Sequence, residues 1–371
     1  MNVENELLKL SNTLVNYSLK VKEGEKVLIS CNSFEPRFLI KCLIRDIVKV
    51  KGIPFVRIID NEINALLTEL TTEERIDEIA KHKKQEVDNY DCFLSIRYTE
   101  NEYEGKHINS FIRKEIGKKT AKSEDVRINK RKWVLLNYPS VIDAYKMGLP
   151  YDEYKEYAIK SMNFDYAGMM QDIKPLKELM EKTDKVRIVS PNTDISFSIK
   201  GIDVVPCCGE SNIPDGEIFT APVKDSVNGT ITYNTPSPYQ GNVYKNVSLT
   251  FKKGKIIKAT CDGDNEALNA IFDTDEGSRY VGEFSLGLNP IITKPMGDIL
   301  YDEKIIGSIH FTPGKCYDDA PNGNDSAIHW DMVLIQREEF GGGEIYFDDV
   351  LIRKDGKFVL KELEHLNYDL K

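Results

Sequence analysis

KVLISCNSFEPRFLIKCLIRDIVKVKGIPFVRIID, residues 26 to 60, contains a short apolar run, a longer amphipathic stretch and a second apolar run. The runs KVLIS (26–30) and PFVRIID (54–60) have the length of buried strands, and the residues at about 35–50 have the apolar spacing of a helix. Strands that alternate with helices through short polar joints form a mostly parallel sheet covered by helices. This stretch therefore predicts an α/β fold.

The same alternation continues on both sides of this stretch. It predicts helices over about 3–20 and 72–86, strands DCFLSIRY (91–98) and WVLLNYP (133–139), and a helical stretch over about 152–182. Neither GxGxxG nor GxxxxGK[ST] follows any of these strands, so the phosphate-binding loops of a nucleotide domain are missing. We expect residues 1–185 to form a Rossmann-like α/β domain that serves as a scaffold.

Strands dominate from Val186 onward, beginning with VRIVSP and DISFSIK. The glycine turns KKGK (252–255) and KDGK (354–357) separate alternating runs and predict hairpins. We therefore expect residues 186–371 to form a second, α+β domain that is rich in antiparallel strands and carries the metal site.

Charge and composition limit the classes of function. The 50 Lys and Arg against 60 Asp and Glu give a net charge of -10, which argues against a general nucleic-acid binder because phosphate binding needs a basic surface. The basic run RINKRKW (127–133) indicates a solvated face. No apolar run reaches the roughly 18 residues of a membrane span, and the acidic start MNVENELLKLSNTL is unlike a signal peptide. Seven cysteines without CxxC spacing indicate reduced thiols. We expect a soluble cytoplasmic protein that does not bind membranes.

Two of the five histidines lie inside apolar strand patterns, His310 in IGSIHF and His329 in SAIHWDMV (326–333). Residues two apart on a strand share a face, so His329 and Asp331 should point the same way. A buried histidine with hydrogen-bond partners is the simpler interpretation of either one alone. The two together, with Asp331, favour a divalent cation that compensates the cost of burying them.

Two glutamates lie in comparable contexts, Glu217 in PDGEIFTAP and Glu283 in RYVGEFSLGLNP. Each alone could be a solvated acid at a strand end. With His310, His329 and Asp331 they form a set of oxygen and nitrogen donors that suits Zn, Co or Mn. Because five side chains exceed what one catalytic metal usually takes, we expect two divalent metals that share a carboxylate and activate a water, as in a hydrolase.

Several of these segments resemble the M29 family of metallo-aminopeptidases, the aminopeptidase T and aminopeptidase S group. The resemblance lies in PDGEIFTAP, GEFSLGLNP, YDEKIIGSIH and SAIHWDM, and in Tyr317 seven residues after His310. Residues 1–185 are similar only in α/β character and in KEGEKVLI.

The resemblance implies a homodimeric exopeptidase that acts on peptides with a free N-terminus, with two divalent metals per subunit and an enclosed active site. It places the metal ligands at Glu217, Glu283, Asp331, His310 and His329, the active-site tyrosine at Tyr317, and a further site position at Glu303.

The hypothesis for the mechanism gives these residues separate tasks. Glu217 or Glu283 accepts the proton of the attacking water, and Tyr317 donates a hydrogen bond to the oxyanion. One alternative is another dinuclear hydrolase such as a phosphoesterase, which needs Lys or Arg at the site; Lys224 and Lys304 are interpreted as near the site in sequence only. The other alternative is a catalytically inactive metal-binding relative.

Overall fold

The computed structural model describes residues 2–368, which form two compact units. As far as its residues are described, one unit comprises Met1–Asn163 and Gly209–Pro214, and the other comprises Phe164–Cys208 and Asp215–Lys371. The division expected between residues 185 and 186 stays a prediction. Within residues 2–368, no helix has both the length and the apolar character that crossing a membrane would require.

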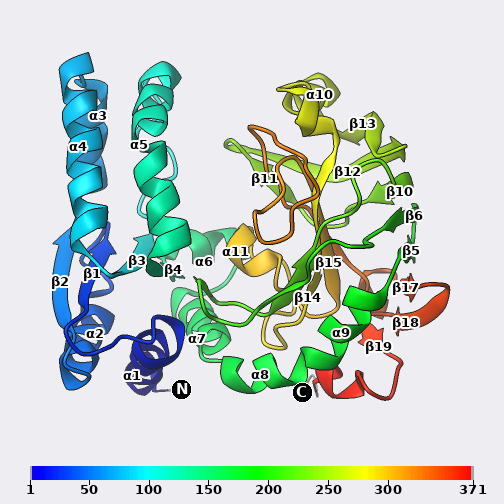
Figure 1. Ribbon diagram of the computed structural model, residues 1–371, viewed down its shortest axis with the longest axis horizontal. Helices are drawn as coiled ribbons and strands as arrows, with labels where there is room; N and C mark the ends of the chain where they lie inside the picture. The colour runs from blue at the N-terminus through cyan, green and yellow to red at the C-terminus, as the bar shows by residue number, and fades with distance from the viewer. Residues whose placement is uncertain (1, 369–371) are drawn as a thin grey trace. The chain divides into compact units, whose positions relative to one another are not determined.

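The first unit is built on a parallel sheet in the order β2-β1-β3-β4-β8. Figure 1 labels the first four of these strands. The opening stretch forms β1 (Lys26–Cys31), α2 (Arg37–Lys49) and β2 (Ile53–Ile58), as predicted. β3 (Cys92–Tyr98) and β4 (Lys132–Tyr138) also match their predictions, and β8 (Asn212–Ile213) completes the sheet. The α/β prediction for this part of the chain is confirmed.

Helices pack against this sheet. α4 (Glu73–Asn89) lies beside α5 (Ser110–Lys130), and α1 (Val3–Asn12), which continues as a π-helix over Thr13–Ser18, lies beside α2 (Figure 1). Val87 of α4 packs on Leu28 and Phe93 of the sheet. The sequence did not predict α5 or α3 (Asn61–Glu69). The last two helices of this unit along the chain are α6 (Val141–Met147) and α7 (Tyr151–Met162).

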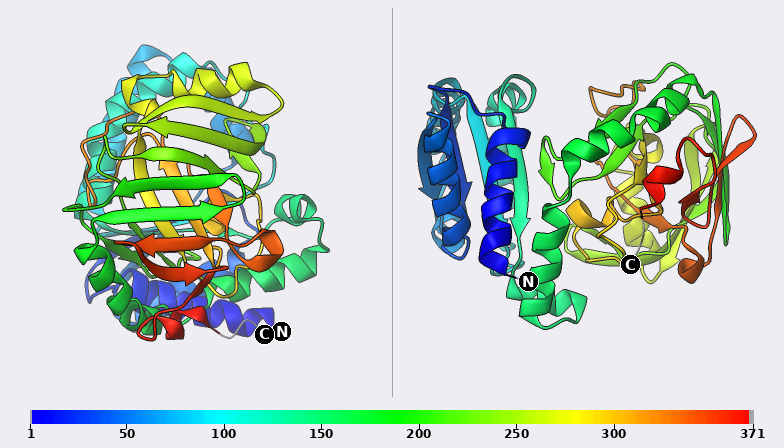
Figure 2. Two further views of the ribbon diagram at one scale, coloured as in Figure 1. Left: turned by 90° about the vertical axis from the view of Figure 1, so that its right-hand side faces the viewer. Right: turned by 90° about the horizontal axis from the view of Figure 1, so that it is seen from below.

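The second unit begins with α8 (Tyr166–Asp172) and α9 (Lys174–Lys182) and contains a nine-stranded sheet, which the left panel of Figure 2 shows face on. Its order is β11-β12-β10-β6-β5-β17-β18-β19, with β13 paired to β12. Both predicted hairpin turns are present, between β12 and β13 and between β18 and β19. The strands are β5 (Lys185–Ser190), β6 (Thr193–Ser198), β10 (Asn228–Thr232), β11 (Ser237–Tyr239), β12 (Asn242–Lys252), β13 (Lys255–Asp262), β17 (Glu344–Phe347), β18 (Val350–Lys354) and β19 (Lys357–Phe358).

A smaller antiparallel sheet packs on the larger one, in the order β16-β15-β14-β9-β7. The ring of Phe197 in the larger sheet lies 5.0 Å from the rings of both Phe284 and Phe311 in the smaller sheet. Because strand residues alternate between faces, the neighbours of these phenylalanines point away from this core. The strands are β7 (Val205–Cys207), β9 (Glu217–Thr220), β14 (Val281–Gly287), β15 (Ser308–Pro313) and β16 (Val333–Ile335), and the helices nearby are α10 (Asn265–Phe272) and α11 (Ile299–Asp302).

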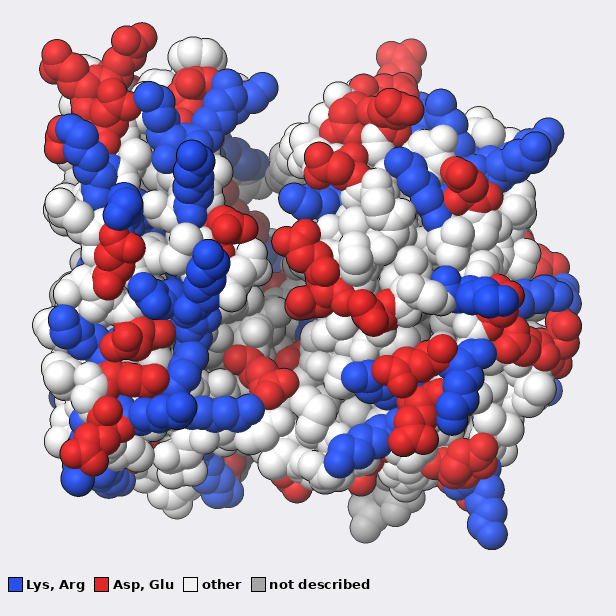
Figure 3. Space-filling model, viewed as in Figure 1, with Lys and Arg blue, Asp and Glu red and all other residues white. Residues whose placement is uncertain are grey.

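Basic and acidic side chains are interspersed over the face drawn in Figure 3. The basic run 127–133 spans the end of α5 and the start of β4, and Arg127 pairs with Glu124 of its own helix over 2.6 Å. This pairing is typical of a solvated helix face.

Candidate metal centre

Three neighbouring strands of the smaller sheet carry the first three candidate ligands. Glu217 begins β9, Glu283 lies in β14 and His310 lies in β15. β14 is central, and its residues Ser285 and Gly287 pair with His310 and Glu217 respectively. Residues paired across strands, and residues two apart along one strand, share a face. The sheet therefore gathers an imidazole and two carboxylates on the side opposite the phenylalanine core.

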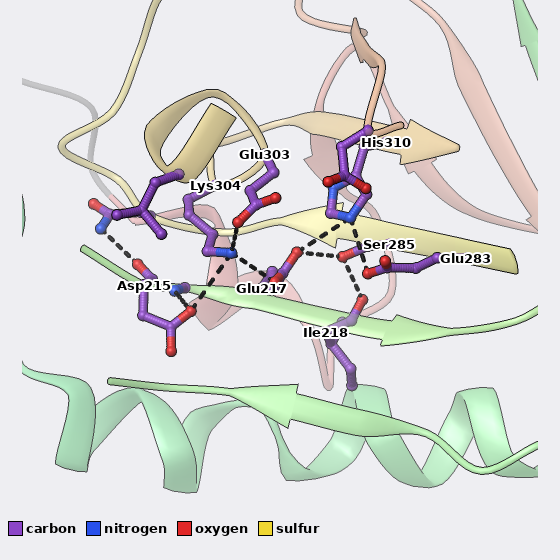
Figure 4. Close-up of polar contacts among 12 residues, drawn as sticks. Asp215, Glu217, Ile218, Glu283, Ser285, Glu303, Lys304 and His310 are labelled. Carbon is purple, nitrogen blue, oxygen red and sulfur yellow. Dashed lines mark hydrogen bonds and ion pairs between the residues drawn. The ribbon is translucent and has the colours of Figure 1, made fainter. Parts of the chain in front are cut away.

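Glu217, Glu283 and His310 form a first group of donors (Figure 4). Nε2 of His310 lies 3.0 Å from Oε1 of Glu283 and 3.4 Å from Oε2 of Glu217. All three residues are buried, with at most 6% of any of them exposed. Their donor atoms lie within 4.8 Å of one another, a spacing that allows one cation to contact all three.

His329 and Asp331 form a second group that shares Glu283. Nε2 of His329 lies 3.3 Å from Oε2 of Glu283 and 3.2 Å from Oδ1 of Asp331. One oxygen of Glu283 therefore faces each imidazole, and Thr312 donates a hydrogen bond of 2.7 Å to Asp331. The structure thus brings all five residues together, with Glu283 between the two imidazoles.

A backbone contact sets the orientation of His329. Its Nδ1 lies 2.8 Å from the carbonyl oxygen of Lys315, so Nδ1 donates the hydrogen bond. Nε2 is buried and faces Glu283 and Asp331 without a hydrogen bond of adequate geometry to either. A histidine held through one nitrogen, with the other directed at carboxylates, is the usual arrangement around a metal ion. The donor set therefore fits a divalent cation.

The charges of the cluster shift the pKa values of its members. Burial lowers the pKa of both imidazoles, but the carboxylates outweigh it: Asp331 and Glu283 raise the pKa of His329 to about 12, and Glu283 and Glu217 raise that of His310 to about 10. Burial also disfavours the carboxylates' charge, yet His329 holds the pKa of Asp331, and His310 that of Glu283, below the usual value. Without a cation, protons on the imidazoles therefore supply the positive charge that the acids need.

The segment 326–333 is not the regular strand that the sequence predicted. Regular pairing begins only at β16, and His329 is held by an isolated bridge to Gly314. The amides of Phe311, Trp330 and Lys315 still donate backbone hydrogen bonds across the two segments. Pro313 has no N–H and Gly314 has a φ of +111°, so the pairing between them is irregular. His329 and Asp331 nevertheless point the same way, as their contact shows.

The residue between them, Trp330, anchors this segment in the core. It is 3% exposed, and its ring lies 4.7 Å from that of Tyr239, 5.3 Å from that of Tyr244 and 5.8 Å from that of Phe272. The aromatic cluster therefore holds an irregular segment in one position, with its polar neighbours directed at the site.

Lys304 lies inside the cluster, so the interpretation that it is near the site only in sequence is wrong. Its Nζ is 2.6 Å from Oε1 of Glu217, contacts Oε1 of Glu303 and is 3.8 Å from Oδ1 of Asp215 (Figure 4). The residue is 0% exposed. No sequence pattern pointed to this contact, because its partner Glu217 is 87 positions away.

Glu303 and Tyr317 border the five residues. Glu303 offers an oxygen within 4.8 Å of donor atoms of His310 and Asp331, and burial raises its pKa to about 8. The ring centroid of Tyr317 lies 4.7 Å from that of His329. Although Tyr317 is 48% exposed, desolvation and the nearby carboxylates raise the pKa of its hydroxyl, which therefore stays protonated at neutral pH.

Gly282 permits the close contact that orients His329, which gives a first testable prediction. A Cβ at this position would lie 2.3 Å from the carbonyl oxygen of Lys315, the acceptor for His329. Gly282→Ala should displace this carbonyl, and we expect the affinity for Co²⁺ in equilibrium dialysis to fall about 10- to 100-fold. The control is Gly117→Ala, because the space around a Cβ there is open. Equal affinities in the two variants would show that the contact does not orient the ligand.

A family model described as thermophilic metalloprotease (M29) matches residues 3–358. The chain belongs to the M29 family. This M29 chain is 34% identical over 164 residues to aminopeptidase 2 of Geobacillus stearothermophilus, a match that covers 39% of the chain and 37% of that protein. It is 29% identical over 153 residues to aminopeptidase T of Thermus thermophilus, a match that covers 37% of each. The matches therefore span little more than a third of the length of these relatives, and the family resemblance seen in the motifs is confirmed.

Two solved structures share the fold of this M29 chain. Wild-type AmpT from Thermus thermophilus has a TM-score of 0.77 at 17% identity, covering 96% of the chain and 99% of that structure. A 2,5-dihydroxypyridine dioxygenase from Pseudomonas putida KT2440 has a TM-score of 0.63 at 14% identity, covering 97% and 99%. Since one fold carries two differently named enzymes, the chemistry of the M29 chain must be argued from its donor residues.

Proposed function

We propose that the chain is a metal-dependent aminopeptidase, an exopeptidase that removes amino acids from the N-terminus of peptides. The observation that carries the proposal is the position of Glu283 between two imidazoles in a chain of a metalloprotease family. Two divalent cations per chain would use all five donors: one cation with Glu217 and His310, the other with His329 and Asp331. Oxygen and nitrogen donors without a thiolate suit Zn, Co or Mn.

Bound divalent cations supply a water of lowered pKa and polarise the scissile carbonyl. The chain's own residues move the proton and orient the substrate. Of the two glutamates expected to act as the base, Glu283 is favoured, because both oxygens of Glu217 already accept hydrogen bonds, one from Lys304 and one from Ser285. Glu283 accepts the proton of the attacking water and passes it to the leaving amine. The protonated hydroxyl of Tyr317, whose ring lies on His329, donates to the oxyanion.

Selectivity for a free N-terminus follows from the acids of the site. Glu303, a carboxylate beside the donors that the proposed ligand set does not use, can pair with the ammonium group of a peptide, whereas a blocked amine carries no charge to pair with it. Peptides with a free N-terminus are therefore the proposed substrates. The homodimer implied by the family resemblance stays a prediction.

The position of Lys304 argues against the alternative function, a phosphoesterase. Its ammonium group is surrounded by Glu217, Glu303 and Asp215, so these carboxylates neutralise the charge that would be needed for a phosphoryl group.

Release of p-nitroaniline from Leu-p-nitroanilide tests the proposal. We expect hydrolysis by the metal-loaded chain, its loss after dialysis against EDTA, and its return when Co²⁺ or Zn²⁺ is added, because the donors must be occupied for the water to be activated. N-acetyl-Leu-p-nitroanilide is the matched control and should not be cleaved. The absence of metal-dependent release from a panel of aminoacyl substrates would contradict the peptidase proposal. Cleavage of p-nitrophenyl phosphate instead would favour the phosphoesterase, and metal binding without either activity would favour the inactive relative.

A further inference from the structure

A buried cationic side chain lies next to the proposed metal ligands. Lys304 is 0% exposed and contacts Glu217, Glu303 and Asp215. Burying an ammonium group is expensive unless carboxylates surround it, and these three acids do so. Its backbone is held as well, since the carbonyl oxygen of Lys304 accepts a hydrogen bond of 3.0 Å from the amide of Asn289. The position of the ammonium group is therefore fixed by the fold.

The ammonium group limits how Glu217 can bind a cation. Oε1 of Glu217 lies 2.6 Å from Nζ of Lys304, and Oε2 accepts a hydrogen bond of 2.8 Å from Ser285 and faces His310 over 3.4 Å (Figure 4). Of the two oxygens of Glu217, only Oε2 therefore faces His310. A glutamate that offers a single oxygen leaves one more coordination position for water than a bidentate glutamate does.

The same ammonium group lies in a corner that has metal-ligand chemistry of its own. Cys207, Asp215 and Glu217 offer a sulfur and two carboxylate oxygens within 4.8 Å of one another. Nζ of Lys304 is next to both carboxylates of this corner, at 3.8 Å from Asp215 and 2.6 Å from Glu217. With its thiol and two carboxylates, this corner has donors that suit Zn and Co. The ammonium group of Lys304 lies where such a metal ion would otherwise bind.

We infer that Lys304 is a positioning residue: its ammonium group fixes Glu217 by one oxygen and occupies the Cys207–Asp215–Glu217 corner in place of a further metal ion. The inference rests on the proposed function in one respect, namely that Glu217 binds a metal. Two consequences follow. The number of metals is kept to those held by oxygen and nitrogen donors, and Glu217 is not drawn away from His310 toward the thiol.

Lys304→Met tests the inference, because it keeps a side chain of similar length and removes the charge. After EDTA dialysis and loading with Co²⁺, the variant should bind about one more Co²⁺ per chain than the parent and gain the intense near-ultraviolet absorption of a cobalt–thiolate bond. Adding Cys207→Ser to the variant should abolish that absorption. With Leu-p-nitroanilide, kcat should fall at least about 10-fold while KM changes less than about 3-fold, since the variant changes the position of Glu217 and not the binding of the substrate. Lys224→Met, a half-buried lysine near the site in sequence, is the control and should match the parent.

An unchanged Co²⁺ stoichiometry together with an unchanged Co²⁺ spectrum in folded Lys304→Met would overturn the inference. A measurement on the parent keeps the test decisive if that variant does not fold: Cys207→Ser alone should leave the number of bound Co²⁺ ions unchanged, and a loss of one ion would show that a metal, and not Lys304, occupies the corner. These outcomes are separate from the proposed activity. If the parent binds Co²⁺ but cleaves no aminoacyl substrate, the aminopeptidase proposal fails while the stoichiometry still decides the role of Lys304.

Discussion

Glu283→Gln is expected to lower kcat/KM for Leu-p-nitroanilide by about 10³- to 10⁴-fold. The amide keeps the size of the side chain, but it cannot accept the proton of the attacking water and carries no charge to share between two cations. Because Glu283 contacts both His310 and His329, the change acts on both donor groups at once.

Metal content and activity should be measured on the same sample of this variant. Glu266→Gln, at an exposed position of α10, is the matched control and should retain the parent's kcat/KM. If a folded Glu283→Gln variant kept more than a tenth of the parent's activity, both proposed roles of Glu283 would be excluded, that of the shared ligand and that of the base.

Loading the metal-free chain at pH 7.5 is expected to release at least about two protons per chain. The pKa values of about 10 for His310 and about 12 for His329 lie above this pH, so both imidazoles are protonated before the metal binds and must lose their protons to become ligands. The affinity should therefore rise by up to about 100-fold per pH unit between about pH 7 and 9. Isothermal titration calorimetry with Zn²⁺ in buffers of different ionisation enthalpy measures the number of protons. A release of less than one proton would contradict the protonation of both imidazoles in the metal-free chain.

The same pKa shifts determine how the stability of the metal-free chain changes with pH. The pKa values of both histidines are raised above their ordinary value of 6.5, so their contribution to stability is complete below about pH 6.5. It is lost as the pH rises through about 10 for His310 and about 12 for His329. The pKa of Asp331 is lowered from 3.8, so its contribution is present above that pH and is lost in acid. These groups therefore stabilise the metal-free chain most between about pH 4 and 6.5.

Much of the fold could be predicted because buried strands carry a local signal. β1 and β3 are apolar runs whose residues are mostly buried, and alternation with α2 specifies a parallel sheet. α5 could not be predicted in this way, since none of its residues is buried and it has no apolar stripe.

The candidate site was predictable to the extent that its polar residues interrupt apolar strands. His310 and Glu283 lie in strands whose residues are all buried, where a charged group needs a partner. Lys304 lies outside any strand, between α11 and β15, and its role depends on contacts with β9 that only the folded chain brings about. The faces of His329 and Asp331 were predicted correctly although their regular strand was not, because Trp330 stays buried in the core and keeps the alternation where the strand pairing is irregular.

Trp330, which lies between His329 and Asp331, also allows the site to be followed by fluorescence. The chain has two tryptophans: Trp330 lies between His329 and Asp331, and Trp133 belongs to β4 of the other unit. Replacing Trp133 with Phe would leave a single indole, whose emission depends on the charge and polarity on either side of it. Occupancy of the site could then be followed in real time by fluorescence, without a chromogenic substrate and without assuming any activity.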